Sequence, residues 1–196
     1  MSALYQVKIT SNKSPSVIGT LPTDFSMEAS SEWTSPFDSG IFDKFSKLAG
    51  AFSFSLKDKR LSSQVWSGSS PIQLTIPIEF MAQTDAKKEV VDPIKNLMKL
   101  ALPGTTGVGG RGEFLDPPGP TVFDQFKTGS TSFNGEKITI TVGKFLRFSK
   151  IVVVSVQPTF TLRLDSRGFP MRGRADVTFR TFTVLSKGDL NRMFLG

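Results

Sequence analysis

The sequence predicts a mainly β protein, an antiparallel β-sandwich or barrel with one α-helix packed on it. Three patterns predict this class. Apolar and polar residues alternate strictly over 72–80, apolar residues have helical spacing over about 85–102, and the last third is strand-rich with a long β-hairpin at about 158–184. At 196 residues the chain suits a single domain, 1–196, that can bury a core without disulfides.

The clearest strand has an apolar side chain at every second position, at Ile72, Leu74, Ile76, Ile78 and Phe80. Pro77 interrupts its polar face, and proline has no N–H to donate to a neighbouring strand. The strand is therefore expected at a sheet edge, or with a bulge at Pro77. Because an exposed edge can pair with a second chain, Ile76, Pro77 and Ile78 are candidate inter-subunit contacts.

The best helix candidate covers about 85–102. Apolar residues fall on one helix face there, at Val90, Val91, Ile94, Leu97, Met98 and Ala101. Asp85 suits the N-cap position, and Pro103 followed by Gly104 ends the pattern. Pro93 either kinks the helix or lies in its first turn behind Asp92.

Residues 104–120 are rich in Gly and Pro, and we expect a loop without a regular element. The glycine run Gly107–Gly112 lacks the Gly-Lys-Ser/Thr ending of a phosphate-binding loop, so no cofactor is predicted. Glu113 and Asp116 flank the glycines, but two carboxylates without further oxygen ligands make a weak cation site. No metal site is predicted.

The N-terminal third is less informative. Leu4–Thr10 alternates like a strand, Phe37–Gly50 contains helical spacing, and Phe52–Leu56 alternates again. Residues 1–60 are interpreted as part of the domain, or as an N-terminal extension or inter-subunit arm. Trp66 comes just before the clearest strand, and it either anchors packing or is a hot spot of an interface, which makes it a candidate contact.

The predicted hairpin at 158–184 is basic. Arginines at alternate positions should project from one region, with one more at the turn: Arg163, Arg172, Arg174, Arg180 and Arg167. Three interpretations stay open: solvated outward positions, salt bridges to a neighbouring subunit, and contact with nucleic acid. No aromatic residues interleave with the arginines, which disfavours binding of single strands. The five arginines are therefore candidate inter-subunit contacts.

Composition argues against catalysis. The chain has no Cys and no His, which excludes Ser-His-Asp and Cys-His catalysis and removes the commonest metal ligands. Asp85, Glu89 and Asp92 fit a solvated helix face, and no facing pair of acids suggests a glycosidase. The sequence therefore predicts no enzyme and no catalytic residues. Neither a signal peptide nor an apolar stretch of ~20 residues is visible, so we expect no membrane anchoring and assembly in a cytoplasm.

The order of motifs resembles a known family. A Trp-x-Gly-Ser turn leads into the strand at 71–80, and then follow Asp85-Ala86, Val90-Val91-x-Pro93-Ile94 and Leu100-Ala101-Leu102-Pro103. Downstream come Pro117-Pro118-Gly119-Pro120, Val142-Gly143-x-Phe145, Val154-x-Val156 and Gly168-x-Pro170. Over roughly Val65 to Phe194, this order resembles the tail-tube-like baseplate proteins of contractile-tailed bacteriophages, the tube-initiator or baseplate-hub class.

The resemblance implies a structural virion protein with a tail-tube-type sandwich or barrel and its helix on the outside. Such proteins form a hexameric ring by sheet extension, at the junction of baseplate and tail tube. The implied partners are copies of the chain, the tail tube protein and a baseplate hub protein, with transient passage of DNA through the lumen. The formal charge of +7 departs from the acidic lumens of that family. The alternative function, a basic nucleic-acid-binding module, is supported only by this charge and the arginine hairpin.

Overall fold

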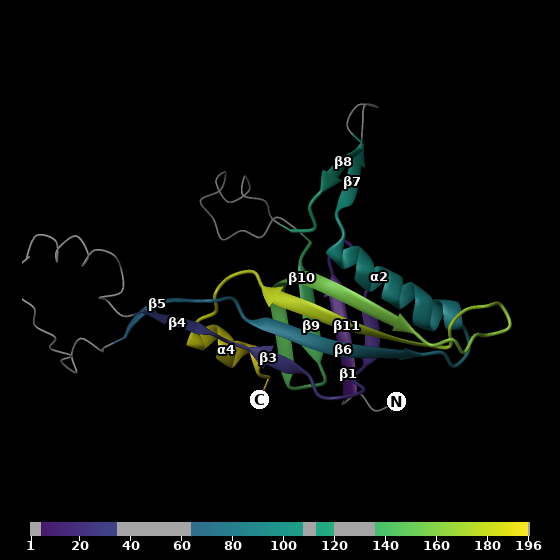
Figure 1. Ribbon diagram of the computed structural model, residues 1–196, viewed down its shortest axis with the longest axis horizontal. Helices are drawn as coiled ribbons and strands as arrows, with labels where there is room; N and C mark the ends of the chain where they lie inside the picture. Colours follow the sequence, from purple (N-terminus) through teal and green to yellow (C-terminus); the bar gives the residue numbers. More distant parts are fainter. Residues whose placement is uncertain (1–4, 35–63, 108–112, 120–135, 196) are drawn as a thin grey trace, which may run out of the picture. The chain divides into compact units, whose positions relative to one another are not determined.

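The computed structural model describes residues 5–34, 64–107, 113–119 and 136–195 (Figure 1). The helix expected within Phe37–Gly50 and the strand expected at Phe52–Leu56 lie outside these ranges. The chain divides into two compact units, one made of Met1–Glu28 and Pro71–Gly196 and the other of Ala29–Ser70. The larger unit is a barrel with a helix, and the smaller one contains a two-stranded ladder.

Six antiparallel strands close into a barrel, in the order β1 (Gln6–Ser11), β2 (Val17–Thr20), β6 (Gln73–Met81), β11 (Arg172–Thr181), β10 (Leu146–Phe160) and β9 (Ile138–Val142), which pairs with β1. A seventh strand, β3 (Ser26–Glu28), pairs with β6 next to β2. The predicted mainly β class and the predicted hairpin, β10–β11, are confirmed. The first strands of the chain belong to the barrel, so residues 1–60 are not as a whole an extension.

Strand β10 forms a corner of the barrel. Its first residues pair with β9 and its later residues pair with β11, and the register shifts between Ser149 and Ile151 and again between Val153 and Ser155. Lys150, within the first irregularity, has a φ of 56°. Extra residues of this kind bend a strand and increase its twist. They therefore let one chain segment serve two sides of a closed sheet.

One hydrophobic core joins the barrel and the helix. Period-two side chains of the strands point inward, and Val7, Ile76, Ile140 and Val177 are fully buried. The helical segment adds one face to the same cluster, namely Val90, Ile94, Leu97 and Leu100. Figure 1 shows this helix lying along the barrel, its axis beside β10 and β11. The prediction of one packed helix is confirmed.

The helical segment begins with a π-helical turn, η2 (Lys87–Val91), and continues as α2 (Asp92–Ala101). The Asp85 carboxylate accepts hydrogen bonds from the backbone N–H groups of Lys87 and Lys88, which confirms it as the N-cap. The N–H of Asp92 bonds to the carbonyl of Lys87, five residues back. Pro93 follows directly after this π-helical turn, at the start of α2.

The expectation that the clearest strand lies at a sheet edge is wrong, because β6 lies between β11 and the pair β2 and β3. The N–H of Ala82 donates to the carbonyl of Met171, and the N–H of Thr181 donates to the carbonyl of Ile72. Hydrogen-bonded and non-hydrogen-bonded pairs alternate along an antiparallel ladder, so Pro77 and Asp176 form a non-hydrogen-bonded pair. The nitrogen of Pro77 therefore points away from β11. On that side β2 pairs at Glu79 and β3 at residues 73–75, and Pro77 lies between them. Proline is tolerated because no strand needs its N–H there.

The segment 104–120 also differs from expectation, because it contains regular structure. Strands β7 (Gly104–Gly107) and β8 (Glu113–Asp116) pair antiparallel, with Gly104 opposite Asp116. The residues in these strands include Thr105, Thr106, Phe114 and Leu115, which favour extended backbone, while the prolines come only afterwards.

A short helix near the C-terminus, α4, spans Lys187–Met193. Its capping box joins Ser186 and Asp189 through reciprocal hydrogen bonds to backbone N–H groups. Among the described residues, no helix is both long enough and apolar enough to cross a lipid bilayer.

Candidate functional site

Three of the predicted contacts lie in the interior. Ile76 and Ile78 are 0% and 1% exposed, and Pro77 is buried on the opposite face of the same strand. The side chains of Ile76 and Ile78 pack in the core of their own barrel, and β6 has a neighbour on both sides. Ile76, Pro77 and Ile78 therefore cannot contact a second subunit in this fold, and the prediction that assigned them to an interface is wrong.

Three of the five arginines lie together on one surface. Arg172, Arg174 and Arg180 are exposed on the outer face of β11, where alternate residues of a strand project together. Each has a different neighbour across the ladder or along the strand. Arg174 is paired with Asp176 at 2.9 Å, Arg180 donates to the side-chain oxygen of Gln73 at 3.0 Å, and Arg172 approaches the sulfur of Met81 at 3.9 Å. We call these three residues the arginine strip.

The arginine strip is unevenly neutralised. Within the part of the chain that the structure describes, only Arg174 has a carboxylate partner in the strip. Arg180 is held in place by a neutral amide instead, so its full positive charge faces outward. Its other cross-strand neighbour is Val152 of β10. In the described ranges the strip thus has two guanidiniums without a carboxylate partner, those of Arg172 and Arg180, and the one of Arg180 is fixed by a hydrogen bond to an amide oxygen.

Arg167 and Arg163 lie apart from the strip, in the hairpin tip between β10 and β11. The chain turns at Asp165–Gly168, where the N–H of Gly168 donates to the carbonyl of Asp165, and Gly168 has a φ of 84°, which glycine adopts without strain. The Arg167 guanidinium is 2.6 Å from the Asp85 carboxylate and 3.3 Å from that of Asp165. Arg167 therefore ties the hairpin tip to the start of the helix, which is a structural role within one chain.

This ion-pair cluster changes the acidity of its members. The hydrogen bond from Arg167 lowers the pKa of the Asp85 carboxyl below its usual value of 3.8. The pKa of Asp165 is lowered first by the backbone N–H of Phe169 and only then by Arg167. Because both carboxyls have a lower pKa in the folded chain, their contribution to stability is present above the usual value and disappears as the pH falls through the lowered one.

We expect the substitution Arg167→Gln to raise the pKa of Asp85 toward its usual value and to raise that of Asp165 less, because the backbone donor to Asp165 remains. A carboxyl titration by nuclear magnetic resonance measures both. Asp189 is the internal control, since Ser186 lowers its pKa and Arg167 plays no part. An unchanged titration of Asp85 in the variant would contradict the role given to Arg167.

The smaller unit presents two tryptophans. Strands β4 (Ser31–Thr34) and β5 (Val65–Ser69) pair antiparallel, and Trp33 lies directly opposite Trp66. Directly opposed residues lie on the same face of a ladder. Trp33 is 56% and Trp66 57% exposed, and the indole nitrogen of Trp66 donates to the Ser69 hydroxyl at 3.1 Å. The sequence singled out Trp66, but it gave Trp33 no special signal, since only the strand register brings the two together.

Further apolar side chains are exposed on the barrel unit. Leu162 in the hairpin tip is 95% exposed, and Leu115 of β8 is 70% exposed. Val154 is the extra residue at the second irregularity of β10 and is 47% exposed. A bulge turns the side chain of its extra residue away from the regular alternation. Val154 therefore adds apolar surface close to Val152 and Arg180.

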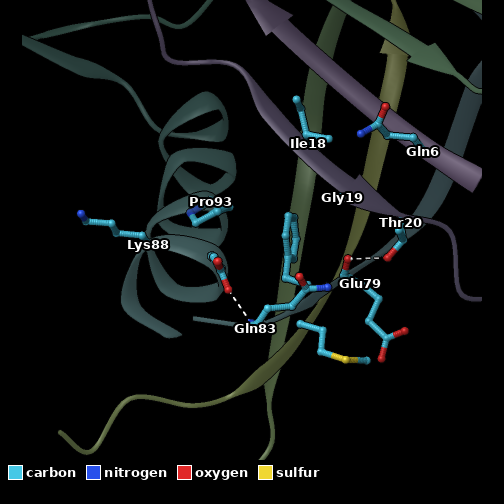
Figure 2. A pocket seen from close by; sticks show the side chains of 11 residues that line it. Gln6, Ile18, Gly19, Thr20, Glu79, Gln83, Lys88 and Pro93 are labelled. Carbon is cyan, nitrogen blue, oxygen red and sulfur yellow. Dashed lines mark hydrogen bonds between the residues drawn. The ribbon is translucent and has the colours of Figure 1, made fainter. Parts of the chain in front are cut away.

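A cleft of about 420 Å³ opens between the helical segment and the ends of β2 and β6 (Figure 2). Glu89 faces it, but its carboxylate accepts hydrogen bonds from the N–H groups of Gln83 and Thr84 and from the Thr84 hydroxyl. These hydrogen bonds lower the pKa of Glu89, and the one from the Gln83 N–H has the largest effect. Glu89 is therefore a charged side chain that caps the neighbouring backbone. Figure 2 shows Lys88 projecting away from the cleft and Thr20 bonded to the backbone oxygen of Glu79.

The cleft does not bring together groups for catalysis. Its two acids are Glu89, which caps the local backbone, and the strand residue Glu79. Of the other polar groups in the lining, Lys88 projects away and the Thr20 hydroxyl is bonded to the backbone oxygen of Glu79. In the described ranges, no three acidic side chains cluster in a way that could hold a metal ion. The exposed aromatic and arginine surfaces are therefore the stronger candidates for a functional site.

Comparison with models of known protein families and with curated proteins finds no match to this chain.

Proposed function

We propose that this chain is a structural protein, not an enzyme, that assembles with copies of itself into a hexameric ring at the junction of a phage baseplate and its tail tube. The order of motifs over Val65 to Phe194 supports the phage assignment, and a closed antiparallel barrel with a packed helix is the fold that it leads one to expect. The partners in this proposal are the tail tube protein and a hub protein, and the location is the virion.

The observation that carries the proposal is the exposed Trp33–Trp66 pair. A two-stranded ladder is marginally stable at best in water, and large aromatic side chains that remain exposed on one favour contact with another surface. Tryptophan is also enriched among the residues that dominate binding energies at interfaces.

The closed barrel refines how assembly should occur. All six barrel strands have a neighbour on each side, so a long barrel edge is not free to accept a strand from a second copy. In this proposal, copies therefore join through their hairpins and outer faces, and not by adding a strand to β6.

A nucleic-acid-binding module is the second candidate function, and the uncompensated charge of Arg180 is the observation that favours it. The outer face of β11 has no aromatic side chain for stacking bases, since its residues are Arg172, Arg174, Asp176, Thr178 and Arg180. Binding to DNA that weakens steeply between low and moderate salt, without any ring, would favour this candidate over the first.

The test of the proposed function is the mass and shape of the assembled protein. We expect native mass measurement to find multiples of 21.4 kDa, and two-dimensional class averages to show rings, with the chain alone or with the tube and hub proteins present. A chain that stays monomeric at high concentration with these partners present would contradict the proposal.

A further inference from the structure

We infer that the Trp33–Trp66 face of one copy docks on the outer sheet face around Arg180 of a second copy. This inference rests on the proposed function, because it names the surfaces through which copies of the chain would join. The two surfaces are different, so the contact is head-to-tail, and repeated contacts of this kind close into a ring when the rotation between copies allows it.

The docking face of the smaller unit is aromatic and electron-rich. Trp33 and Trp66 lie side by side across the ladder, with Ser31 and Ser69 bonded to each other next to them at 3.2 Å. The only ionisable side chain in the described part of this unit is Glu32, which is acidic and exposed. Glu32 alternates with Ser31 and Trp33 along β4 and so projects from the other face of the ladder, and the docking face itself presents the negative faces of two indole rings.

The receiving face is complementary. Arg180 is exposed, bonded to Gln73 and unpaired with any carboxylate in the described ranges, so its guanidinium is held in place while its charge is available. Val152 lies across the ladder from it, and the bulge exposes Val154 beside them. A guanidinium next to apolar atoms is a surface on which indole rings stack, through cation–π attraction and apolar contact. We call Val152, Val154 and Arg180 the Arg180 patch.

The other arginines fit less well. Arg174 is neutralised by Asp176 and lies opposite Glu79, so the negative faces of the indole rings would meet carboxylates there. Arg167 is engaged with Asp85 and Asp165. Arg172 also has no carboxylate partner in the described ranges, but its contact is a 3.9 Å approach to the Met81 sulfur, whereas Arg180 is fixed by a 3.0 Å hydrogen bond to Gln73. Arg180 is thus the arginine of β11 that combines free charge, a fixed position and apolar neighbours.

The surface area that the two tryptophans would bury is large enough for the core of an interface. Fully burying a tryptophan removes roughly 150–250 Å² from solvent, so covering the exposed halves of two removes roughly 200 Å². A stable interface buries about 800 Å² on each partner. The tryptophans would supply its central anchors, with neighbouring strand residues completing the rim.

Single cysteines test this contact directly, because the chain has none of its own. Ser31→Cys lies on the tryptophan face and Ser155→Cys follows Val154, and each replaces only an oxygen by sulfur. Two differently tagged copies, each with one of these substitutions, are mixed and treated with a short bismaleimide. We expect a cross-linked pair that carries both tags. Ser149→Cys, on the same strand β10 but farther along, is the matched control and should give little product with Ser31→Cys.

Two further variants separate docking from folding. Trp33→Ser with Trp66→Ser, and separately Arg180→Ser, should reduce the cross-linked product and weaken association by roughly tenfold or more. Leu162→Ser, which changes a side chain that is more exposed still, should leave both unchanged. All these positions are exposed, and unchanged circular dichroism verifies that each variant is folded.

Three results would overturn the inference. These are rings that form without the Ser31–Ser155 cross-link, a cross-link that forms within one chain when both cysteines are on the same copy, and association that survives loss of the tryptophans. The first of these leaves the proposed function intact, whereas a chain that never assembles refutes the proposed function itself.

Discussion

Replacing Phe179 by alanine is expected to lower the free energy of unfolding by about 3–5 kcal/mol. Phe179 is fully buried and is among the largest buried side chains in the described part of the chain. It lies on β11 opposite Leu74 of β6 and Val153 of β10, at the centre of the barrel wall. Removing the ring therefore leaves a cavity that three hydrogen-bonded strands cannot collapse to fill.

Urea unfolding followed by circular dichroism measures this loss. Phe160→Ala is the matched control, because Phe160 belongs to the same hairpin but is 42% exposed and should cost clearly less. Equal losses for the two variants would show that the barrel core is not where the structure places it. The variant Phe179→Ala should also lose assembly in proportion to its unfolded fraction, unlike Arg180→Ser, which should lose assembly while folded.

The strands of the barrel could be predicted because one face of each is buried. Val7 and Ile9 in β1, Ile138, Ile140 and Val142 in β9, and Ala175, Val177 and Phe179 in β11 alternate with polar residues, and all are buried. The same reasoning predicted the helix, since its buried residues repeat at helical spacing. Patterns of this kind indicate which side chains are buried.

Strand neighbours could not be predicted in the same way. Alternation shows which face of β6 is buried, but it does not show what pairs with its two edges. Pro77 suggested a free edge, but two short strands, β2 and β3, pair with the same side of β6, and Pro77 lies in the gap between them. A missing N–H is therefore compatible with a central strand when its neighbour on that side changes.

The candidate site was predicted in part. The alternation of β11 was enough to place Arg172, Arg174 and Arg180 on one face. It could not distinguish Arg180 from Arg174, because the two arginines differ only in their hydrogen-bond partners. Arg180 donates to Gln73, which is distant in sequence, and Arg174 donates to the carboxylate of Asp176. Trp33 was missed for a similar reason, since only its register with Trp66 makes it notable. Buried patterns are local in sequence, whereas exposed sites depend on contacts between distant segments.

Gly19→Ala is expected to lower the free energy of unfolding by about 1–3 kcal/mol through overpacking. A Cβ at this position would collide with the Cγ2 methyl of Ile78 and would lie 3.0 Å from the ring of Phe80. Both neighbours are buried on β6, and a β-branched side chain in a strand has little freedom to move aside. Glycine is thus required here by close approach of two strands.

The damage should be concentrated where β2 meets β6. These strands share one register pair, Thr20 with Glu79, so the join is the shortest in the barrel and the added methyl pushes on it directly. Gly68→Ala is the matched control, because it also lies in a strand, β5, and a Cβ there would meet nothing within 4 Å. We expect urea unfolding to show a loss for Gly19→Ala and almost none for Gly68→Ala.

A double-mutant cycle identifies the cause. Ile78→Ala removes the colliding methyl, at its own cost of about 2–5 kcal/mol for the cavity, and the new methyl on residue 19 then has room. The double variant should therefore lose less than the sum of the single losses, by a coupling of about 0.5–3 kcal/mol. Strictly additive losses would show that Gly19 is needed for its backbone rather than for the approach of β2 to β6. Because this join closes the barrel, coupling here would also establish that β6 lies inside a closed sheet and is not available as an edge for a second copy.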